Sequence, residues 1–542
     1  MNRALVLREL TRRGAWSAGG GRRMKNSVWK TFMELSLVRG IVPWTVFGLT
    51  AIAAIILIVG LALSKKRGPA ADGLAPGGLA PDGESSAQSP VDPDNQPANQ
   101  PTNAAATASS AASTEETFIS HGLRTPQRRH LHPLAAALAA AVLAGAGGLL
   151  ATWLMSDVFM VFGVSLGWPV IRTVAGGFAG LGFVLAAAVT LRGARRALAV
   201  VLVPLVLAST ALGVDSIYGE YRTIGNLVGY TPYPPLGSVT VRKASMSVGE
   251  WRDKARKDAL PSMPDSGRVF AVDIPNTESK FKARKAMVYL PPAALSDRPP
   301  ALPVMELLAG QPGSPGRLID AGNIAATMNA YAAEHDGLAP IVLAPDQNGS
   351  AMHNSLCADT TRGNAETYLT KDVVNWATTT LPVAKSARMW AMGGFSQGGT
   401  CTTQLVPRHP DIYGAMLPVD GELEPTDGSV ETMVRRYFAG DRKAYDRQVP
   451  VNAIAATGTA GQALFAGAGK GDRKSVANMR TIAAAARAAG MQTTELVVPG
   501  ADHDWHAVQA VWNPGLDWFG ARTGLGEMTK SLEEYPQVEV LQ

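Results

Sequence analysis

The sequence predicts two kinds of structure in one chain. A four-helix, all-α transmembrane domain is followed by an α/β domain built on a doubly wound, mostly parallel sheet. Two observations lead to this prediction: four apolar stretches lie within the first 214 residues, and from about residue 239 onward short β-rich runs alternate with helical patterns. With 542 residues the chain is long enough for several domains.

The apolar stretches are nearly free of charged residues, and the charges gather at their ends. Each stretch approaches the roughly 20 helical residues that cross a bilayer core. We therefore expect membrane-spanning helices rather than buried helices of a soluble domain. They lie at residues 42–63, 134–155, 173–191 and 197–214.

Basic residues in the short loops predict the orientation of these helices, because Lys and Arg favour the cytoplasmic side. Arg192, Arg195 and Arg196 lie between the third and fourth stretches, and further basic clusters follow the first and precede the second. We expect a multi-pass protein of the cytoplasmic membrane, with both termini and the α/β domain outside the cytoplasm. The many basic residues of segment 1–32 oppose this, so either translation begins at Met33 rather than Met1 or the first span has the opposite sense.

Residues 68–117 are rich in Pro, Gly, Ala and Ser and lack apolar periodicity, so we expect a disordered linker. The formal net charge of +6 owes much to basic residues near the tail and the spans. We therefore expect the lipid bilayer, and no nucleic acid, as a partner. The predicted division is an N-terminal tail (1–40), a first transmembrane helix (41–64), the linker (65–133), transmembrane helices two to four (134–219), a connector (220–260) and the α/β domain (261–542).

In the α/β domain the expected strands are residues 269–272, 286–290, 304–308, 340–344, 388–392, 415–419, 462–466 and 494–498. The expected helices between them include residues 323–335, 369–380, 400–409 and 475–489. Strands that alternate with helices form parallel sheets covered on both faces. Such sheets bind ligands at the carboxyl ends of their strands.

Ser396 lies at such a strand end, in the run Gly394-Phe395-Ser396-Gln397-Gly398. A G-x-S-x-G run between a strand and a helix is typical of the nucleophile elbow of α/β-hydrolases. Neighbours without side chains let the strand and the helix approach each other, so that the serine protrudes. A glycine-rich turn with an incidental serine is the alternative.

A serine nucleophile needs a base, and the base needs an orienting carboxylate; in α/β-hydrolases these follow in the order Ser, acid, His. Two histidines follow the last expected strand. His503 is the favoured base because it belongs to a polar loop, whereas His506 is expected to begin a helix. Asp472 is the favoured acid, with a plain helix cap as the alternative role. Asp502 and Asp504 rank behind it because they adjoin the histidine in sequence.

Two backbone N–H groups should bind the oxyanion of the tetrahedral intermediate. Gln397 follows the nucleophile, and Gln311 lies in the glycine-rich loop after strand 304–308. A proline-rich turn without a catalytic role is the alternative for the second. We expect no cofactor and no metal, because two cysteines are too few for a metal cluster and no glycine-rich run ends in the Gly-Lys-Ser/Thr of a phosphate loop.

Five pieces of the sequence, spread over roughly residues 303–518, belong together: "LLAGQPGSPG", "CADTTRGNAETYLTKDVVNW", "GGFSQGGTC", "GKGDR" and "HDW". In combination they resemble the esterase-D-like α/β-hydrolases, a group that includes the mycolyltransferases of mycobacterial cell walls. The resemblance implies that Ser396 is the nucleophile, His503 the base and Asp472 the acid. It also implies that Gln397 and Gln311 provide the oxyanion amides.

The membrane part, which ends in "DSIYGEYRTIGNLVG", resembles the four-span leader of actinobacterial membrane esterases. Cysteines recur in such esterases within "SLCADT" and "GGTC". This resemblance implies a disulfide between Cys357 and Cys401, with two free buried thiols as the alternative.

The sequence thus predicts a membrane-anchored, extracytoplasmic serine esterase. It would hydrolyse carboxylic esters of lipid or cell-envelope substrates, aminoacylated phospholipids among them, through an acyl-enzyme. Transfer of the acyl group to a sugar or lipid hydroxyl is one alternative. A non-catalytic, membrane-tethered binding or sensor module is another, and it would be indicated by loss of a triad residue, but none is missing from the sequence.

Overall fold

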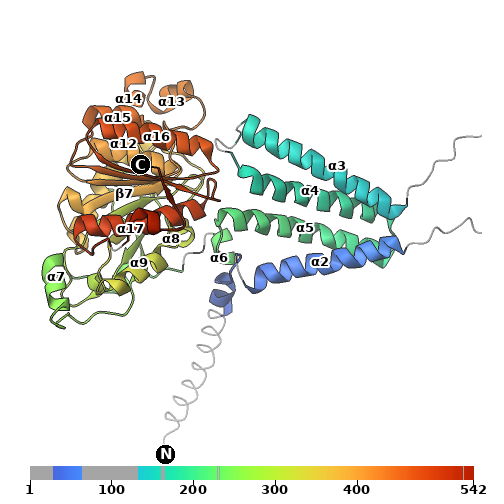
Figure 1. Cartoon of the computed structure of the whole chain (residues 1–542), viewed down its shortest axis with the longest axis horizontal. Helices are drawn as coiled ribbons and strands as arrows, with labels where there is room; N and C mark the ends of the chain where they lie inside the picture. The colour runs from blue at the N-terminus through green and yellow to red at the C-terminus, as the bar shows by residue number, and fades with distance from the viewer. Residues whose placement is uncertain are drawn as a thin grey trace, which may run out of the picture.

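The structure is a computed structural model, and it describes residues 28–38, 40–63, 132–159, 161, 165–228, 230, 232–528 and 530–541. A bundle of long helices lies with one end against a domain built on a central sheet (Figure 1). The predicted linker at 68–117, residues 1–27 of the tail and the basic residues at 65–67 and 124–129 lie outside the described residues.

Within the described residues, four helices are long and apolar enough to cross a membrane. They are α2 (Ile41–Ala62), α3 (Pro133–Trp153, continued by a π-helical turn, Leu154–Val158), α4 (Gly167–Thr190) and α5 (Ala194–Tyr218). They agree with the four predicted stretches, although α4 begins six residues earlier than predicted and α5 ends four residues later. Most residues of these helices are not buried, as lipid contact would require, and a small group that includes Leu57, Leu61 and Leu202 is buried between them.

Close approach of α3 and α4 depends on a small residue in α4. A Cβ atom on Gly182 would lie 2.5 Å from the carbonyl oxygen of Ala140, so a larger residue would push the two helices apart. Small residues have this role in many membrane helix pairs.

The described residues of the second domain form a nine-stranded sheet in the order β1-β2-β4-β3-β7-β8-β9-β10-β11. The sheet is parallel from β4 to β10 and antiparallel at its two edges, which confirms the predicted mostly parallel sheet. The strands are β1 (Arg268–Val272), β2 (Ala286–Leu290), β3 (Val304–Leu308), β4 (Ile341–Ala344), β7 (Trp390–Phe395), β8 (Ala415–Val419), β9 (Ala463–Gly469), β10 (Gln492–Val498) and β11 (Glu539–Val540).

Helices cover both faces of this sheet, as doubly wound α/β domains require (Figure 1). One face carries α12 (Gln397–Leu405), α15 (Pro450–Thr457) and α16 (Arg473–Ala488). The other carries α8 (Pro315–Ala321), α9 (Ile324–Glu334) and α17 (Trp505–Thr523). The central strands are therefore buried on both sides, and every residue of β3, β7 and β9 is buried.

The segment predicted as a connector, residues 220–260, contributes its later half to the core of the α/β domain. Helix α7 (Val248–Ala255) buries Trp251 completely, and the indole N–H donates to the carbonyl of Asp336 at 3.0 Å. The packed α/β unit therefore includes residues before the predicted boundary at 261.

A disulfide joins Cys357 to Cys401, which confirms the predicted pairing. It links the long loop after β4 to the helix that follows Ser396.

Replacing both cysteines with serine is expected to destabilise the domain by about 4 kcal/mol, because the bond closes a 44-residue separation in the unfolded chain. Thermal unfolding of the full chain in detergent should show this loss, and wild type in reductant should fall to the same midpoint. Equal midpoints for oxidised wild type and the double variant would contradict the prediction.

Candidate active site

Ser396 lies at a sharp turn between β7 and α12. Its backbone has φ 56° and ψ −118°, a conformation that non-glycine residues seldom adopt outside strained functional turns. A Cβ atom on Gly398 would lie 2.2 Å from the carbonyl oxygen of Leu308, so only glycine lets α12 approach β3 this closely. The motif therefore forms the elbow that its sequence predicts.

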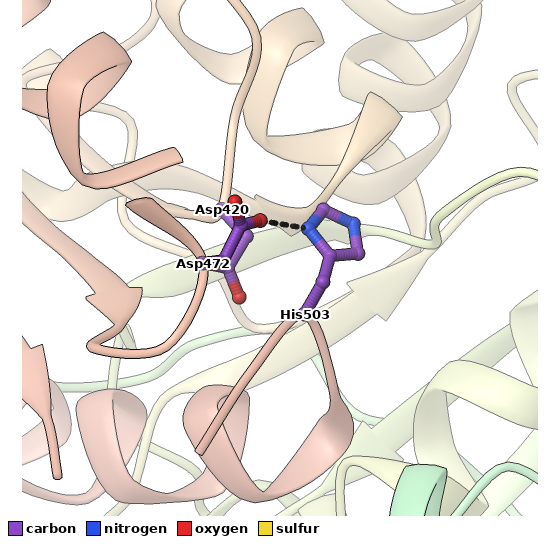
Figure 2. Close-up of side chains that lie close together, drawn as sticks. All are labelled: Asp420, Asp472 and His503. Atoms are coloured by element: carbon purple, nitrogen blue, oxygen red, sulfur yellow. Dashed lines mark hydrogen bonds and ion pairs between the residues drawn. The ribbon is translucent and has the colours of Figure 1, made fainter. Parts of the chain in front are cut away.

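His503 and Asp472 meet although 31 residues separate them. Nδ1 of His503 lies 2.8 Å from Oδ2 of Asp472 (Figure 2). Asp472 follows β9 and is also the N-cap of α16, since it accepts hydrogen bonds from the backbone N–H and the hydroxyl of Ser475 at 3.1 and 2.6 Å. The two roles left open by the sequence, acid and helix cap, are therefore compatible in one side chain.

The imidazole of His503 lies beside the elbow. Its ring centroid is 5.0 Å from that of Phe395, the residue before Ser396. One of the competing acids is engaged elsewhere: Asp504 caps α17 by accepting from the N–H groups of His506 and Ala507 at 2.8 and 3.0 Å. The structure thus pairs the favoured histidine with the favoured acid next to Phe395, and the action of Ser396, His503 and Asp472 as a catalytic triad stays a prediction.

The charges around His503 and Asp472 suit the roles of a base and an orienting anion. Burial by itself would lower the pKa of His503, but the hydrogen bond to Asp472 and the nearby Asp420 carboxyl raise that pKa above its ordinary value. Burial would raise the pKa of Asp472, but the hydrogen bonds from His503 and Ser475 lower it below the ordinary value. An ionised Asp472 can therefore stabilise the imidazolium that forms when His503 accepts a proton.

Asp420 is a second buried carboxyl in this cluster, and the sequence did not predict it (Figure 2). It follows β8 with φ 51°, its Oδ1 accepts from the N–H of Gly469 at 2.9 Å, and its Oδ2 has no hydrogen-bond partner among the described residues. Burial, aided by the charge of Asp472, raises the pKa of Asp420 to about 8 against the opposing effect of His503. The available signal was an acid directly after a parallel strand, at the edge where ligands bind.

Asp420, Asp472 and His503 each offer one ligand atom, and these atoms lie within 4.8 Å of one another. The set could hold a cation. Such an ion would need Nδ1 of His503 as a ligand and would displace the proton that this nitrogen shares with Asp472. The arrangement therefore suits proton transfer better than metal binding.

Asp420→Asn is expected to make the stability of the folded protein depend less on pH between about 4 and 8. The pKa of the Asp420 carboxyl is about 8 in the folded protein against 3.8 for an ordinary aspartate, so the folded state holds a proton that the unfolded state loses. Wild type should lose stability as pH rises from about 4 to 8, by up to roughly 5 kcal/mol from this group. Asparagine can retain both the positive φ and the hydrogen bond from Gly469.

The unfolding midpoint at pH 5 minus that at pH 8 measures this effect. It should be smaller in Asp420→Asn than in wild type, whereas Asp411→Asn, at an exposed loop position, should match wild type. Parallel pH curves for all three proteins would contradict the prediction.

The predicted oxyanion donors border the serine. Gln397 is the first residue of α12, where backbone N–H groups have no partner within the helix. The loop after β3 approaches from the other side, because a Cβ atom on Gly310 would lie 3.4 Å from Cβ of Ser396. Gln311 is the next residue, and its role as the second donor stays a prediction.

Polar side chains of the loop after β4 contact Gln397 directly and reach the loop after β3 through Arg284, and the sequence did not predict these contacts. Arg284 donates to both carboxylate oxygens of Asp346, at 2.9 and 2.7 Å, and to the carbonyl of Gly313 at 3.0 Å. The Asn348 and Gln397 side-chain amides form a reciprocal pair at 2.7 and 3.0 Å. The run "PDQN" after an expected strand was the signal available.

Comparisons with known proteins agree with this geometry. Residues 279–518 match the family model described as "Putative esterase". An uncharacterized protein of Corynebacterium glutamicum is 32% identical over 344 residues, which are 61% of this chain and 78% of that protein.

Several solved structures are similar to the α/β domain. A ferulic acid esterase is 18% identical with a TM-score of 0.41, over 48% of this chain and 99% of that one. An S-formylglutathione hydrolase from Agrobacterium tumefaciens is 17% identical with a TM-score of 0.40, over 48% and 99%. MPT51 (FbpC1) of Mycobacterium tuberculosis is 15% identical with a TM-score of 0.35, over 49% and 99%. The family model together with the Corynebacterium relative shows that the chain belongs to this esterase family, and the parallel sheet and the elbow at Ser396 give its C-terminal domain the fold of an α/β-hydrolase.

Proposed function

We propose that this protein is a serine esterase, anchored in the cytoplasmic membrane, that hydrolyses carboxylic esters of lipid or cell-envelope substrates on the extracytoplasmic side. One observation supports this above others: the loop that carries His503 contacts the ends of the apolar helices. A Cβ atom on Gly167, where α4 begins, would lie 2.4 Å from Oδ2 of Asp502. A Cβ atom on Gly219, just after α5, would lie 3.7 Å from Cβ of Trp505. The site is therefore level with one end of the bundle, where ester groups of membrane lipids would be within reach.

The chemistry follows from the geometry. Oγ of Ser396 attacks the ester carbonyl carbon while Nε2 of His503 takes the hydroxyl proton, and Asp472 stabilises the resulting imidazolium. The N–H groups of Gln397 and Gln311 bind the oxyanion, where each donor contributes about 3 kcal/mol. The intermediate expels the alcohol, which takes the proton from His503. Water then attacks the acyl-enzyme with His503 again as base, the bond between the acyl carbon and Oγ breaks, and Oγ takes the proton back from His503 as the carboxylic acid leaves. An acceptor alcohol in place of water would give acyl transfer.

The proposed sidedness rests on the basic residues of the bundle. Arg192, Arg195 and Arg196 lie around the turn between α4 and α5, at the end of the bundle away from the sheet (Figure 1). Lys and Arg favour the cytoplasmic side, so the hydrolase domain would lie outside.

A fluorophosphonate that cannot cross membranes should label Ser396 in intact cells, and labelling only after lysis would contradict this orientation.

Reconstitution tests the substrate class. The full chain is placed in vesicles that contain a fluorescent ester lipid, and the rate of hydrolysis is compared with that for the same lipid in separate vesicles. Anchoring raises the local substrate concentration, so hydrolysis should be at least about tenfold faster within one membrane. Equal rates, or hydrolysis of soluble esters alone, would contradict the membrane-substrate proposal. Label recovered on an added sugar or glycerol acceptor would indicate acyl transfer instead.

A further inference from the structure

We propose that Glu220, in the segment between α5 and the hydrolase domain, is a positioning residue. It fixes the position of the histidine loop (residues 499–504) relative to the oxyanion loop (residues 310–313). This inference rests on the proposed esterase function and adds the membrane part of the chain to the active site. Glu220 directly follows Gly219, the C-cap of α5, and its side chain is 24% exposed. Its two carboxylate oxygens bind partners at the starts of two helices, Trp505 of α17 and Arg317 of α8, and each helix directly follows a loop of the candidate active site.

The first partner leads to His503. The indole N–H of Trp505 donates to Oε2 of Glu220. Trp505 is two residues after His503, and both rings pack on Phe395, with centroid distances of 4.9 Å for Trp505 and 5.0 Å for His503. The carboxylate of Glu220 therefore fixes one side of a cluster of three rings, those of Phe395, His503 and Trp505. The cluster lies beside the elbow, because Phe395 immediately precedes Ser396.

The second partner leads to the oxyanion loop. Nε of Arg317 lies 3.1 Å from Oε1 of Glu220, and the guanidinium stacks on Tyr221 at 4.2 Å from the ring centroid. Arg317 belongs to the first turn of α8, whose N-cap Ser314 directly follows loop 310–313. The Arg317 side chain is only 15% exposed, so this ion pair is less screened than a surface pair.

Neighbouring residues of the same segment hold the other end of α8. Arg222 donates to the carbonyl of Asp320 at 3.1 Å and to the side chain of Asn323 at 3.0 Å. The amide of Asn226 donates to Oδ2 of Asp320 at 2.8 Å. Helix α8 is therefore fixed at both ends by residues 220–226, and Glu220 links it to Trp505.

Glu220 acts through its partners, because its carboxylate binds Trp505 and Arg317 rather than the reacting groups. Loss of its bonds would let the His503 loop shift relative to loop 310–313. Misplacement of catalytic groups by about 1 Å can cost a hundredfold in rate. The substrate-binding surface itself would stay in place, so kcat should fall while KM changes little.

Kinetics of the full chain in detergent with a soluble short-chain ester test this inference. Glu220→Ala is expected to lower kcat about tenfold with less than about a twofold change in KM. Trp505→Phe, which removes the indole N–H and keeps an aromatic ring, should cause a similar loss. Because both changes break the same link between the His503 loop and α8, the double variant should be little slower than either single variant. Glu220→Gln keeps an acceptor for Trp505 but loses the ion pair with Arg317, so it should recover only part of the rate.

Asp297→Ala is the matched control, because it breaks an exposed ion pair with Arg242 on the hydrolase domain. It should leave kcat unchanged, and unfolding midpoints of all variants identify any that fail to fold. Wild-type kcat in Glu220→Ala, or losses that multiply in the double variant, would overturn the inference while the esterase proposal stands. Absence of Ser396-dependent hydrolysis in wild type would instead overturn the esterase proposal.

Discussion

Ser396→Ala is expected to reduce ester hydrolysis by roughly 10⁴- to 10⁶-fold and to abolish labelling by a fluorophosphonate. Alanine removes the only atom that forms the acyl-enzyme, whereas the His503–Asp472 pair and the oxyanion donors remain. The residual rate would come from those groups acting on water. The measurement is turnover of a chromogenic short-chain ester by the purified full chain, together with labelling of the same samples.

Ser386→Ala is the matched control, since that serine is exposed and its side chain caps no helix. It should retain wild-type turnover and labelling. If Ser396→Ala hydrolysed the ester as fast as wild type, the triad would not be the catalyst. Absence of labelling in wild type itself would favour the alternative of a membrane-tethered binding module.

The buried strands were the most predictable part of the fold. Strands β2, β3 and β8 match the predicted residues at both ends, because strands buried on both faces are continuous apolar runs. Strand β7 was predicted two residues too early. Residues 387–389 form a 3₁₀ turn, and the strand continues through Gly393 and Gly394, which have low strand propensity. Strand β11 is only two residues long and gave no pattern to detect.

Residues 420–462 contain three helices that were not predicted. They are α13 (Val430–Tyr437), α14 (Arg442–Asp446) and α15. Each of the first two begins with a side-chain cap, Ser429 and Asp441, which was a readable signal. Their short length left too little periodicity to distinguish them from loops.

Some residues of the candidate site could be predicted from the local sequence, and others could be found only from contacts in the folded chain. Ser396 was recognisable from its neighbours, and His503 and Asp472 from their order after the strands. Asp420 and Glu220 act through contacts that only the folded chain creates. Glu220, for example, meets Trp505 across a separation of 285 residues. No local pattern marks such a pair, so the link between the membrane part and the catalytic loops required the structure.

Asp472→Asn is expected to lower kcat by roughly 10⁴-fold near neutral pH. Asparagine is nearly the same size and is also a good N-cap, so the start of α16 should be preserved and the loss should be chemical rather than structural. An amide can donate to Nδ1 of His503 and thereby favour the tautomer with its proton on Nε2, where the base must accept one. It also carries no charge to stabilise the imidazolium.

The pH profile of kcat/KM distinguishes this loss of orientation from simple misfolding. His503 acts as a base in its neutral form, and its hydrogen bond to Asp472 raises its pKa, so wild-type activity should rise with pH through a value above that of an ordinary histidine. Without the carboxylate the pKa of His503 should fall, and the acid limb of the residual activity should move to lower pH.

Asp502→Asn is the matched control, because Asp502 adjoins His503 in sequence while the imidazole hydrogen-bonds to Asp472. If Asp502→Asn rather than Asp472→Asn caused the large loss, the acid would be misassigned, and an unmoved acid limb would mean that Asp472 does not set the pKa of the base.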